Sequence, residues 1–175
     1  SEVEKVLREA REILKKNKRE NEEVHKKSKE IAERNREKNE KVHRDSRKII
    51  EELKELADRG KDARELDEAV KRLADENRRV NEDSERDIKR LAEENRRVND
   101  ESRKDIERLV RKLEKDGVDE DEARKLVKEV RETLEDSARR DEKLIEDLKR
   151  TLDESKKEDD KLIEELERRL REAER

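Results

Sequence analysis

The sequence predicts an all-α protein, a straight and weakly supercoiled up-down-up bundle of three long helices. Three observations predict it: blocks of residues recur at an interval of 18, two glycines with capping residues divide the chain, and apolar residues follow a helical period. Eighteen residues make about five turns of an unstrained α-helix, so each recurrence returns like side chains to the same helix face. Although the chain is 62% charged and only 26% hydrophobic, a composition typical of disorder, this periodicity favours folded helices.

The first helix is expected over residues 2–58. Ser1 and Glu4 fit a capping box, in which a hydroxyl and a carboxylate accept hydrogen bonds from amides that the first turn leaves free. Gly60 suits the left-handed conformation that ends a helix. This stretch repeats Asn17, Asn21, Val24, His25, Ser28, Ile31 and Ala32 as Asn35, Asn39, Val42, His43, Ser46, Ile49 and Ile50.

The second helix is expected over residues 63–115. Asp62 with Glu65 three residues later predicts its start, and Gly117 predicts its end. Its repeat turns Asn77, Val80, Asn81, Ser84, Asp87 and Ile88 into Asn95, Val98, Asn99, Ser102, Asp105 and Ile106.

The third helix is expected over residues 120–174. Asp119 would cap it with Glu122, while Val118 would pack on Ala123 as a hydrophobic staple. Here Thr133, Leu134, Ser137, Asp141, Leu144, Ile145 and Leu148 recur as Thr151, Leu152, Ser155, Asp159, Leu162, Ile163 and Leu166.

The short turns predict antiparallel neighbours and one helical-bundle domain over residues 1–175. On a helical wheel the core-type residues fill an arc of about 120°, which suits a helix that contacts two neighbours. No second apolar face remains, so a closed three-helix bundle is favoured over an open half of a larger assembly.

Polar residues occupy the middle of the apolar stripe and are therefore expected to face the bundle axis. Partners across the first turn should have numbers that sum to about 121, and across the second turn to about 235. We therefore predict two structural hydrogen-bond networks. One contains Asn21, His25, Ser28, Asn95, Asn99, Ser102, Ser137 and Asp141, and the other contains Asn39, His43, Ser46, Asn77, Asn81, Ser84, Ser155 and Asp159.

A buried polar group without a partner costs on the order of 1–3 kcal/mol, so these residues should bond to one another. Their expected role is specificity, because a network is satisfied in one helix register whereas a purely apolar core tolerates several. This role is a hypothesis.

Composition argues against several functions. Because 52 basic and 56 acidic residues leave a net charge of −4 and no residue is aromatic, nucleic-acid binding is not expected. No apolar run reaches the about 20 residues that span a bilayer, and no targeting signal is visible. We therefore expect a soluble chain with no membrane partner, suited to cytoplasmic recombinant expression but of unknown location. Without cysteine the chain has no disulfides or thiolate sites.

The histidines allow three sharper interpretations. His25 near Asp141, and His43 near Asp159, would supply at most two ligands each, too few for a closed metal site. Protonation of either imidazole could make stability depend on pH. Ser137 with His25 and Asp141 resembles part of a catalytic triad, but an interior serine would lack a cleft and oxyanion donors. We predict no catalytic, metal or cofactor site, and no enzyme activity.

The repeated blocks, the Glu/Lys/Arg surface, the glycine turns and the buried Asn, Ser, His and Asp sets together resemble computationally designed parametric helical bundles with buried hydrogen-bond networks. The resemblance covers the whole chain and implies a structural scaffold, expected to be monomeric and to bind no small molecule. Two alternatives remain. The chain could be an interaction module, the three-helix component of a hetero-oligomer or homo-oligomer. It could also be a natural spectrin-like repeat or coiled coil, although a repeat of 3.5 residues per turn and aromatic core positions would then be expected.

Overall fold

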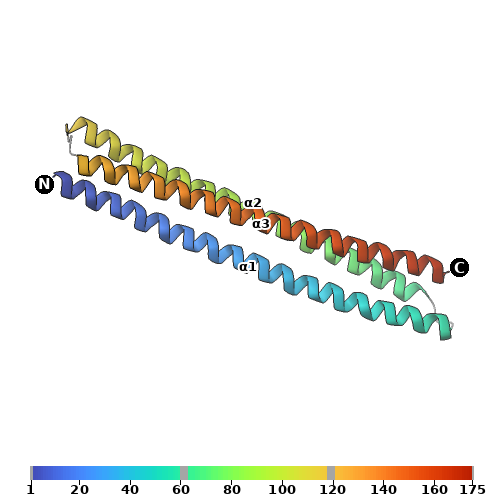
Figure 1. The fold of residues 1–175 in the computed structure, drawn as a ribbon. Coiled ribbons are helices and arrows are strands. Elements are labelled where there is room, and N and C mark those ends of the chain that lie inside the picture. Colours follow the sequence, from blue (N-terminus) through green and yellow to red (C-terminus); the bar gives the residue numbers. More distant parts are fainter. Residues whose placement is uncertain (1, 60–62, 118–120, 175) are drawn as a thin grey trace. The chain divides into compact units, whose positions relative to one another are not determined.

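The computed structural model describes residues 2–59, 63–117 and 121–174 of the chain. It contains three long α-helices and no strand within these residues (Figure 1). The all-α prediction of three long helices is confirmed, and the helix ends fall within a residue or so of those expected. The helices are α1 (Glu2–Arg59), α2 (Arg64–Lys115) and α3 (Asp121–Ala173).

The turn after α2 contains the left-handed glycine that the sequence predicts. Gly117 has a φ of 64°, and its N–H donates to the carbonyl of Glu114 at 3.3 Å. A side chain at this position would be strained by the backbone conformation alone, because a Cβ there meets nothing within 4 Å. The predicted roles of Ser1, Gly60, Asp62, Val118 and Asp119 lie outside the described residues.

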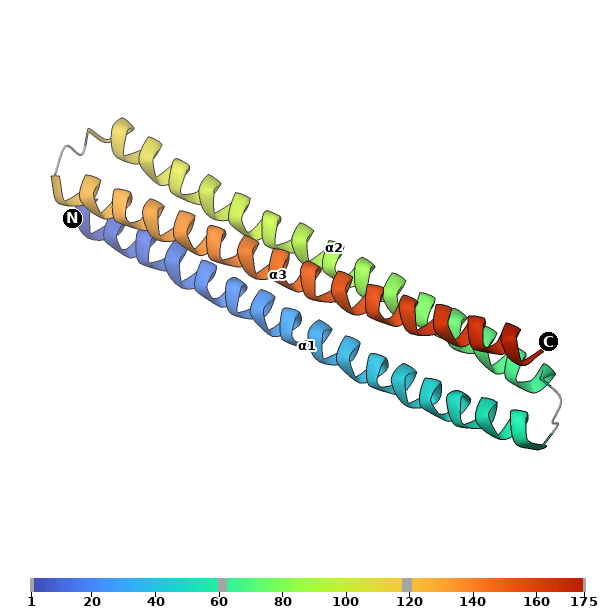
Figure 2. The same ribbon diagram turned by 45° about the vertical axis from the view of Figure 1, so that its right-hand side comes forward.

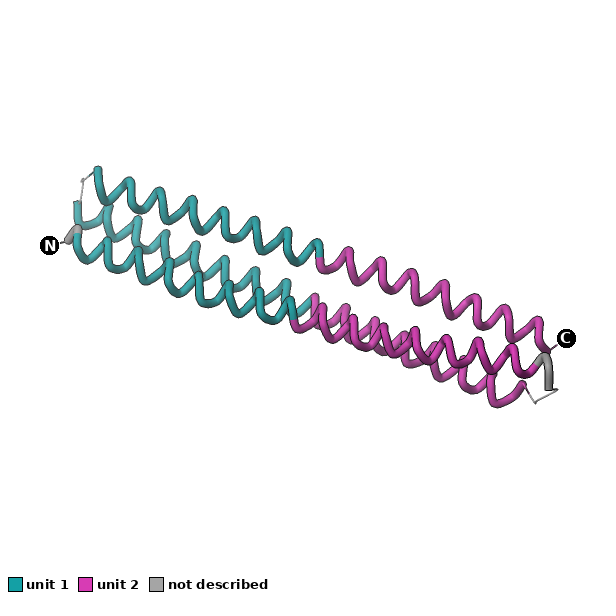
Figure 3. The backbone as a smooth tube through the Cα atoms, turned by 60° about the horizontal axis from the view of Figure 1, so that its bottom comes forward, with its two compact units in different colours: residues 1–29, 89–147 teal, residues 30–88, 148–175 magenta. Residues whose placement is uncertain are grey.

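The chain divides into two compact units, coloured separately in Figure 3. Unit 1 comprises Ser1–Lys29 and Lys89–Asp147, and unit 2 comprises Glu30–Ile88 and Leu148–Arg175. Each unit takes one segment from each helix, and in both ribbon views the three segments of a unit lie side by side (Figure 1, Figure 2). The single domain expected from the sequence stays a prediction.

Each unit has its own apolar cluster, to which all three helices contribute. The clusters form because Leu, Ile and Val recur three or four residues apart on one face of each helix. In unit 1 the buried members are Val6, Ala10, Ile106, Leu109, Leu113, Ala123, Val127, Val130 and Leu134. In unit 2 they are Val42, Ile49, Leu53, Leu56, Leu66, Val70, Leu73, Ile163, Leu166 and Leu170.

Contacts between helices fix their relative directions within each unit. In unit 1, Lys112 on α2 bonds to Glu9 on α1, and Glu94 bonds to Lys27, so the residue numbers run in opposite directions and the helices are antiparallel. The polar contacts between α1 and α3 described below keep a constant sequence separation of 116, which makes these two helices parallel. Both relations are those of an up-down-up bundle.

The described surface is polar. No large hydrophobic side chain is exposed among the described residues. None of the described helices has a segment long and apolar enough to cross a membrane.

Candidate functional site

A chain of four side chains joins the three helices of unit 1. Asn17 on α1 donates from Nδ2 to Ser102 Oγ on α2 at 2.8 Å. Asn21, one turn later, donates to Asn17 Oδ1 at 2.8 Å and to Ser137 Oγ on α3 at 2.5 Å. The spacing of four residues places both amides on one face of α1, so one helix bonds to both neighbours.

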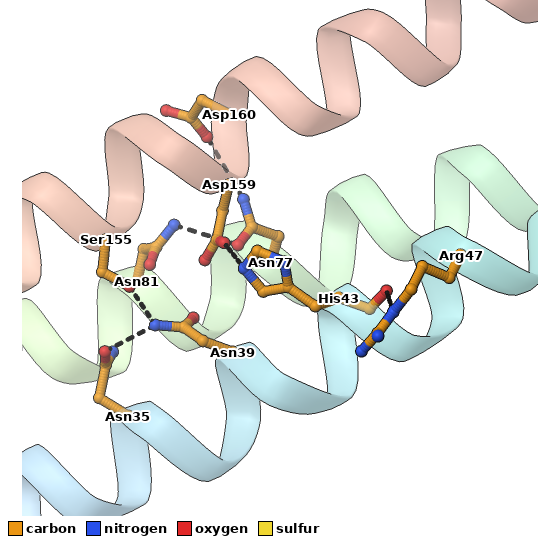
Figure 4. Close-up of polar contacts among 9 residues, drawn as sticks. All are labelled: Asn35, Asn39, His43, Arg47, Asn77, Asn81, Ser155, Asp159 and Asp160. Atoms are coloured by element: carbon orange, nitrogen blue, oxygen red, sulfur yellow. Dashed lines mark hydrogen bonds and ion pairs between the residues drawn. The ribbon is translucent and has the colours of Figure 1, made fainter. Parts of the chain in front are cut away.

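Unit 2 repeats this chain with the residues 18 positions away on each helix (Figure 4). Asn35 Nδ2 donates to Ser84 Oγ at 2.8 Å, and Asn39 Nδ2 donates to Asn35 Oδ1 at 2.8 Å. Asn39 also donates to Ser155 Oγ, and Figure 4 shows these two side chains pointing toward one another from α1 and α3. The repeated sequence thus produces a repeated set of hydrogen bonds, one in each unit.

A histidine and an aspartate form a second link between α1 and α3 in each unit. His25 Nε2 lies 2.6 Å from Asp141 Oδ1 in unit 1, and His43 Nε2 lies 3.0 Å from Asp159 Oδ1 in unit 2. The imidazole side chains are 51% and 44% exposed, whereas the carboxylates are 2% and 1% exposed. Each aspartate is therefore a core residue that contacts a histidine at the bundle surface.

The two pairs differ in how well the buried carboxylate is compensated. Asp141 has a hydrogen bond with His25, but neither oxygen of Asp159 has a partner with hydrogen-bond geometry in the described structure. Burial raises the pKa of Asp159, an effect that the nearby His43 opposes and the charges of Asp160 and Glu158 reinforce. Asp159 is thus an acidic group that the fold holds in an unfavourable environment when it is ionised.

Asn77 and Asn81 on α2 contact a different aspartate from the one expected. The sequence placed both amides with His43 and Asp159. In the structure Asn77 donates to Asp160 Oδ1 at 3.3 Å, and Asn81 donates to Asn77 Oδ1 at 3.4 Å (Figure 4). The second amide chain therefore leads away from the buried carboxylate.

The remaining candidates are buried but not joined into these chains. Asn95, Asn99, Ser28 and Ser46 are each at most 7% exposed. The side-chain oxygens of Asn95, Asn99 and Ser46 have no hydrogen-bond partner in the described structure, and neither do Asn21 Oδ1 and Asn39 Oδ1. The two fully connected networks expected from the sequence are therefore realised as shorter chains, with several buried acceptors left over.

The predicted set omitted three residues that the structure places in the polar chains. Asn17 and Asn35 begin the α1 part of each chain, and Asp160 accepts from Asn77. The signal for the two asparagines was present, because they recur 18 residues apart at the centre of the apolar stripe. Asp160 had no such signal, since its counterpart in the repeat is Glu142.

The geometry offers little for catalysis or metal binding. Ser137 Oγ is bonded to Asn21, while His25 Nε2 contacts Asp141, so the contacts present do not pair the serine with the imidazole. Within the described residues no group of three or more His, Cys, Asp or Glu side chains is arranged to hold a metal ion. What the arrangement does chemically is join helices through buried hydrogen bonds.

Comparison with known proteins gives one structural likeness. No protein-family model matches the chain, and no curated protein matches it. Among solved structures, the chain is similar to one described as a computationally designed three helix bundle, with 17% sequence identity and a TM-score of 0.47. The match covers 98% of this chain and 86% of the other. A likeness this distant transfers no property of that protein to this chain.

Proposed function

We propose that the chain is a non-enzymatic structural scaffold of the designed-bundle type, in which the buried polar chains specify helix pairing and register. One observation carries the proposal: the Ser–Asn–Asn–Ser chain occurs in both units with the same partners 18 residues apart. A shift of one helix relative to the others would break every one of these bonds. Losing a buried partner costs on the order of 1–3 kcal/mol per group, so alternative registers are disfavoured.

The test replaces the polar chains with apolar residues. We would change the four α1 asparagines to Leu and the four serines to Ala. The variant should resist urea better than the parent but lose its single state, and light scattering should show species heavier than the 21.2 kDa chain. The changed residues are Asn17, Asn21, Asn35, Asn39, Ser84, Ser102, Ser137 and Ser155.

A control variant carries Leu134→Ile and Leu152→Ile, which alter buried apolar residues but leave the polar chains intact. It should remain a single species near 21.2 kDa. If the network-free variant also stays one monomeric species with unchanged helix register, the polar chains do not specify the packing and the proposal fails.

The same measurement addresses the alternative, an interaction module that completes its core with further helices. That function predicts a parent chain heavier than 21.2 kDa or poorly folded by itself. The buried acceptors without partners favour it, because a neighbouring chain could supply donors. The lack of exposed large hydrophobic side chains on the described residues favours the scaffold, since helix partners usually dock on an apolar face.

A further inference from the structure

Unit 2 contains a cavity between its α1 and α3 segments. Its volume is about 400 Å³, and the residues that form its inner wall include Ala32, Asn35, Asn39, Leu148, Leu152 and Ser155. Its lining also includes the exposed residues Glu33, Arg36 and Glu40, so the cavity opens to solvent. Ligand pockets are commonly of this size, with apolar walls and a few polar groups.

The cavity has an origin in the sequence. Ala32 occupies a position of the 18-residue repeat that holds Leu14 in one direction and Ile50 in the other. Leu14 and Ile50 each pack against an apolar cluster, whereas the methyl group of Ala32 borders the cavity. A small side chain at a position otherwise filled by a large one leaves space that neighbours do not fully recover.

Two polar groups at the cavity have unused hydrogen-bonding capacity. Asn39 uses both amide hydrogens, to Asn35 and to Ser155, while its buried Oδ1 has no donor in the described structure. Ser155 Oγ accepts from Asn39, which leaves its own hydrogen free to donate. A ligand hydroxyl could therefore donate to the amide oxygen and accept from the serine, satisfying both groups.

The charges around the opening favour a neutral ligand. Glu33 and Glu40 outnumber the single Arg36, whose Nε lies 4.0 Å from Glu40 Oε1. A carboxylate or phosphate ligand would find no uncompensated cation among these lining residues. An apolar ring, in contrast, gains by leaving water for the surfaces of Leu148 and Leu152.

We propose that this cavity binds a small neutral aromatic alcohol, with its ring against Ala32, Leu148 and Leu152 and its hydroxyl at Asn39 and Ser155. The sequence itself gave us no reason to expect a small-molecule ligand. A dry cavity of about 150 Å³ in another protein suffices for benzene, so the space here accommodates a two-ring phenol.

The probe is 2-naphthol at pH 7, where its hydroxyl is protonated. The protein has no aromatic residue, so the fluorescence anisotropy of the probe reports binding without a protein background. We expect saturable binding with one site per chain. Ala32→Leu should weaken binding about tenfold or more, because the added side chain occupies the ring's space. Glu37→Leu, on the exposed face of α1 and outside the cavity, should leave the affinity unchanged and controls for nonspecific apolar binding.

The hydroxyl contact is tested separately. Ser155→Ala should weaken 2-naphthol several-fold and leave the affinity for naphthalene unaltered. If circular dichroism shows that Ala32→Leu does not fold, Thr151→Leu fills the same cavity from α3 and replaces it. The proposal is overturned if 2-naphthol binding does not saturate, if the cavity-filling variant binds as tightly as the parent, or if Ser155→Ala affects both ligands alike.

Discussion

Asp159 and Asp141 occupy equivalent places in the two units but are compensated differently. His25 forms a hydrogen bond of 2.6 Å to Asp141, whereas the carboxylate of Asp159 has an ion pair with His43 but no hydrogen bond of good geometry. A buried ion pair stabilises a fold only if hydrogen bonds offset the loss of hydration. The negative charge on Asp159 is therefore a cost to stability that a single substitution can remove.

We expect Asp159→Asn to raise the free energy of unfolding at pH 7 by on the order of 1 kcal/mol, because the amide has the same shape without the charge. The pKa of Asp159 in the folded state is raised above its ordinary 3.8. Its favourable contribution is thus fully present below pH 3.8 and is lost as the pH rises through the raised pKa. The advantage of the variant should accordingly shrink on acidification, as measured by urea unfolding at pH 7 and near pH 4.

Asp141→Asn is the matched control, since it breaks a short hydrogen bond to His25 and should lower stability at pH 7. Equal destabilisation by both variants would show that the two carboxylates are compensated alike, contrary to the structure.

At the scale of the helices, stability comes from the apolar clusters and register from the polar chains. Leu166 on α3 is fully buried in the cluster of unit 2, where it packs among residues of all three helices. The polar chains contribute fewer apolar contacts but make directional bonds at fixed positions. Cluster and chain therefore have different roles along the same helix face.

Leu166→Ala should cost about 2–5 kcal/mol, because it removes apolar burial and leaves a cavity. Leu126→Ala provides the comparison on the same helix, since Leu126 is only partly buried against the cluster of unit 1 and should cost less. Urea unfolding of both variants measures the difference. A smaller loss for Leu166→Ala than for Leu126→Ala would contradict this assignment of the core.

At the scale of the whole molecule, each of the three helices contributes residues to both compact units. A helix that begins in one unit and ends in the other must lose hydrogen bonds at the boundary if one unit unfolds alone. This continuity favours cooperative unfolding of the entire chain over two independent steps.

We therefore expect a single thermal transition, with equal calorimetric and van't Hoff enthalpies. Leu166→Ala, a change confined to unit 2, should also reduce the amide-exchange protection of unit 1 residues such as Leu109. Two separate transitions, or unchanged protection in unit 1, would instead show two domains and refute the single-domain prediction.

The sequence alone was enough to predict the helices. The interval of 18 residues fixes which side chains share a face, and glycine at position 117 marks a turn because only a residue without Cβ adopts a positive φ freely. It also located the polar stripe, since periodicity identifies faces without any knowledge of neighbours. These features depend on contacts within one helix or one turn.

Only the tertiary structure decided which polar atoms meet. The sequence could not show that Asn77 bonds to Asp160 rather than to Asp159, that the imidazoles lie half exposed, or that Ala32 borders a cavity. Each depends on the rotation and separation of helices, and a shift of about one ångström exchanges one hydrogen-bond partner for another because hydrogen bonds tolerate only a narrow range of distance. A one-dimensional repeat specifies the face of a helix, whereas atomic pairing is set by how three such faces pack.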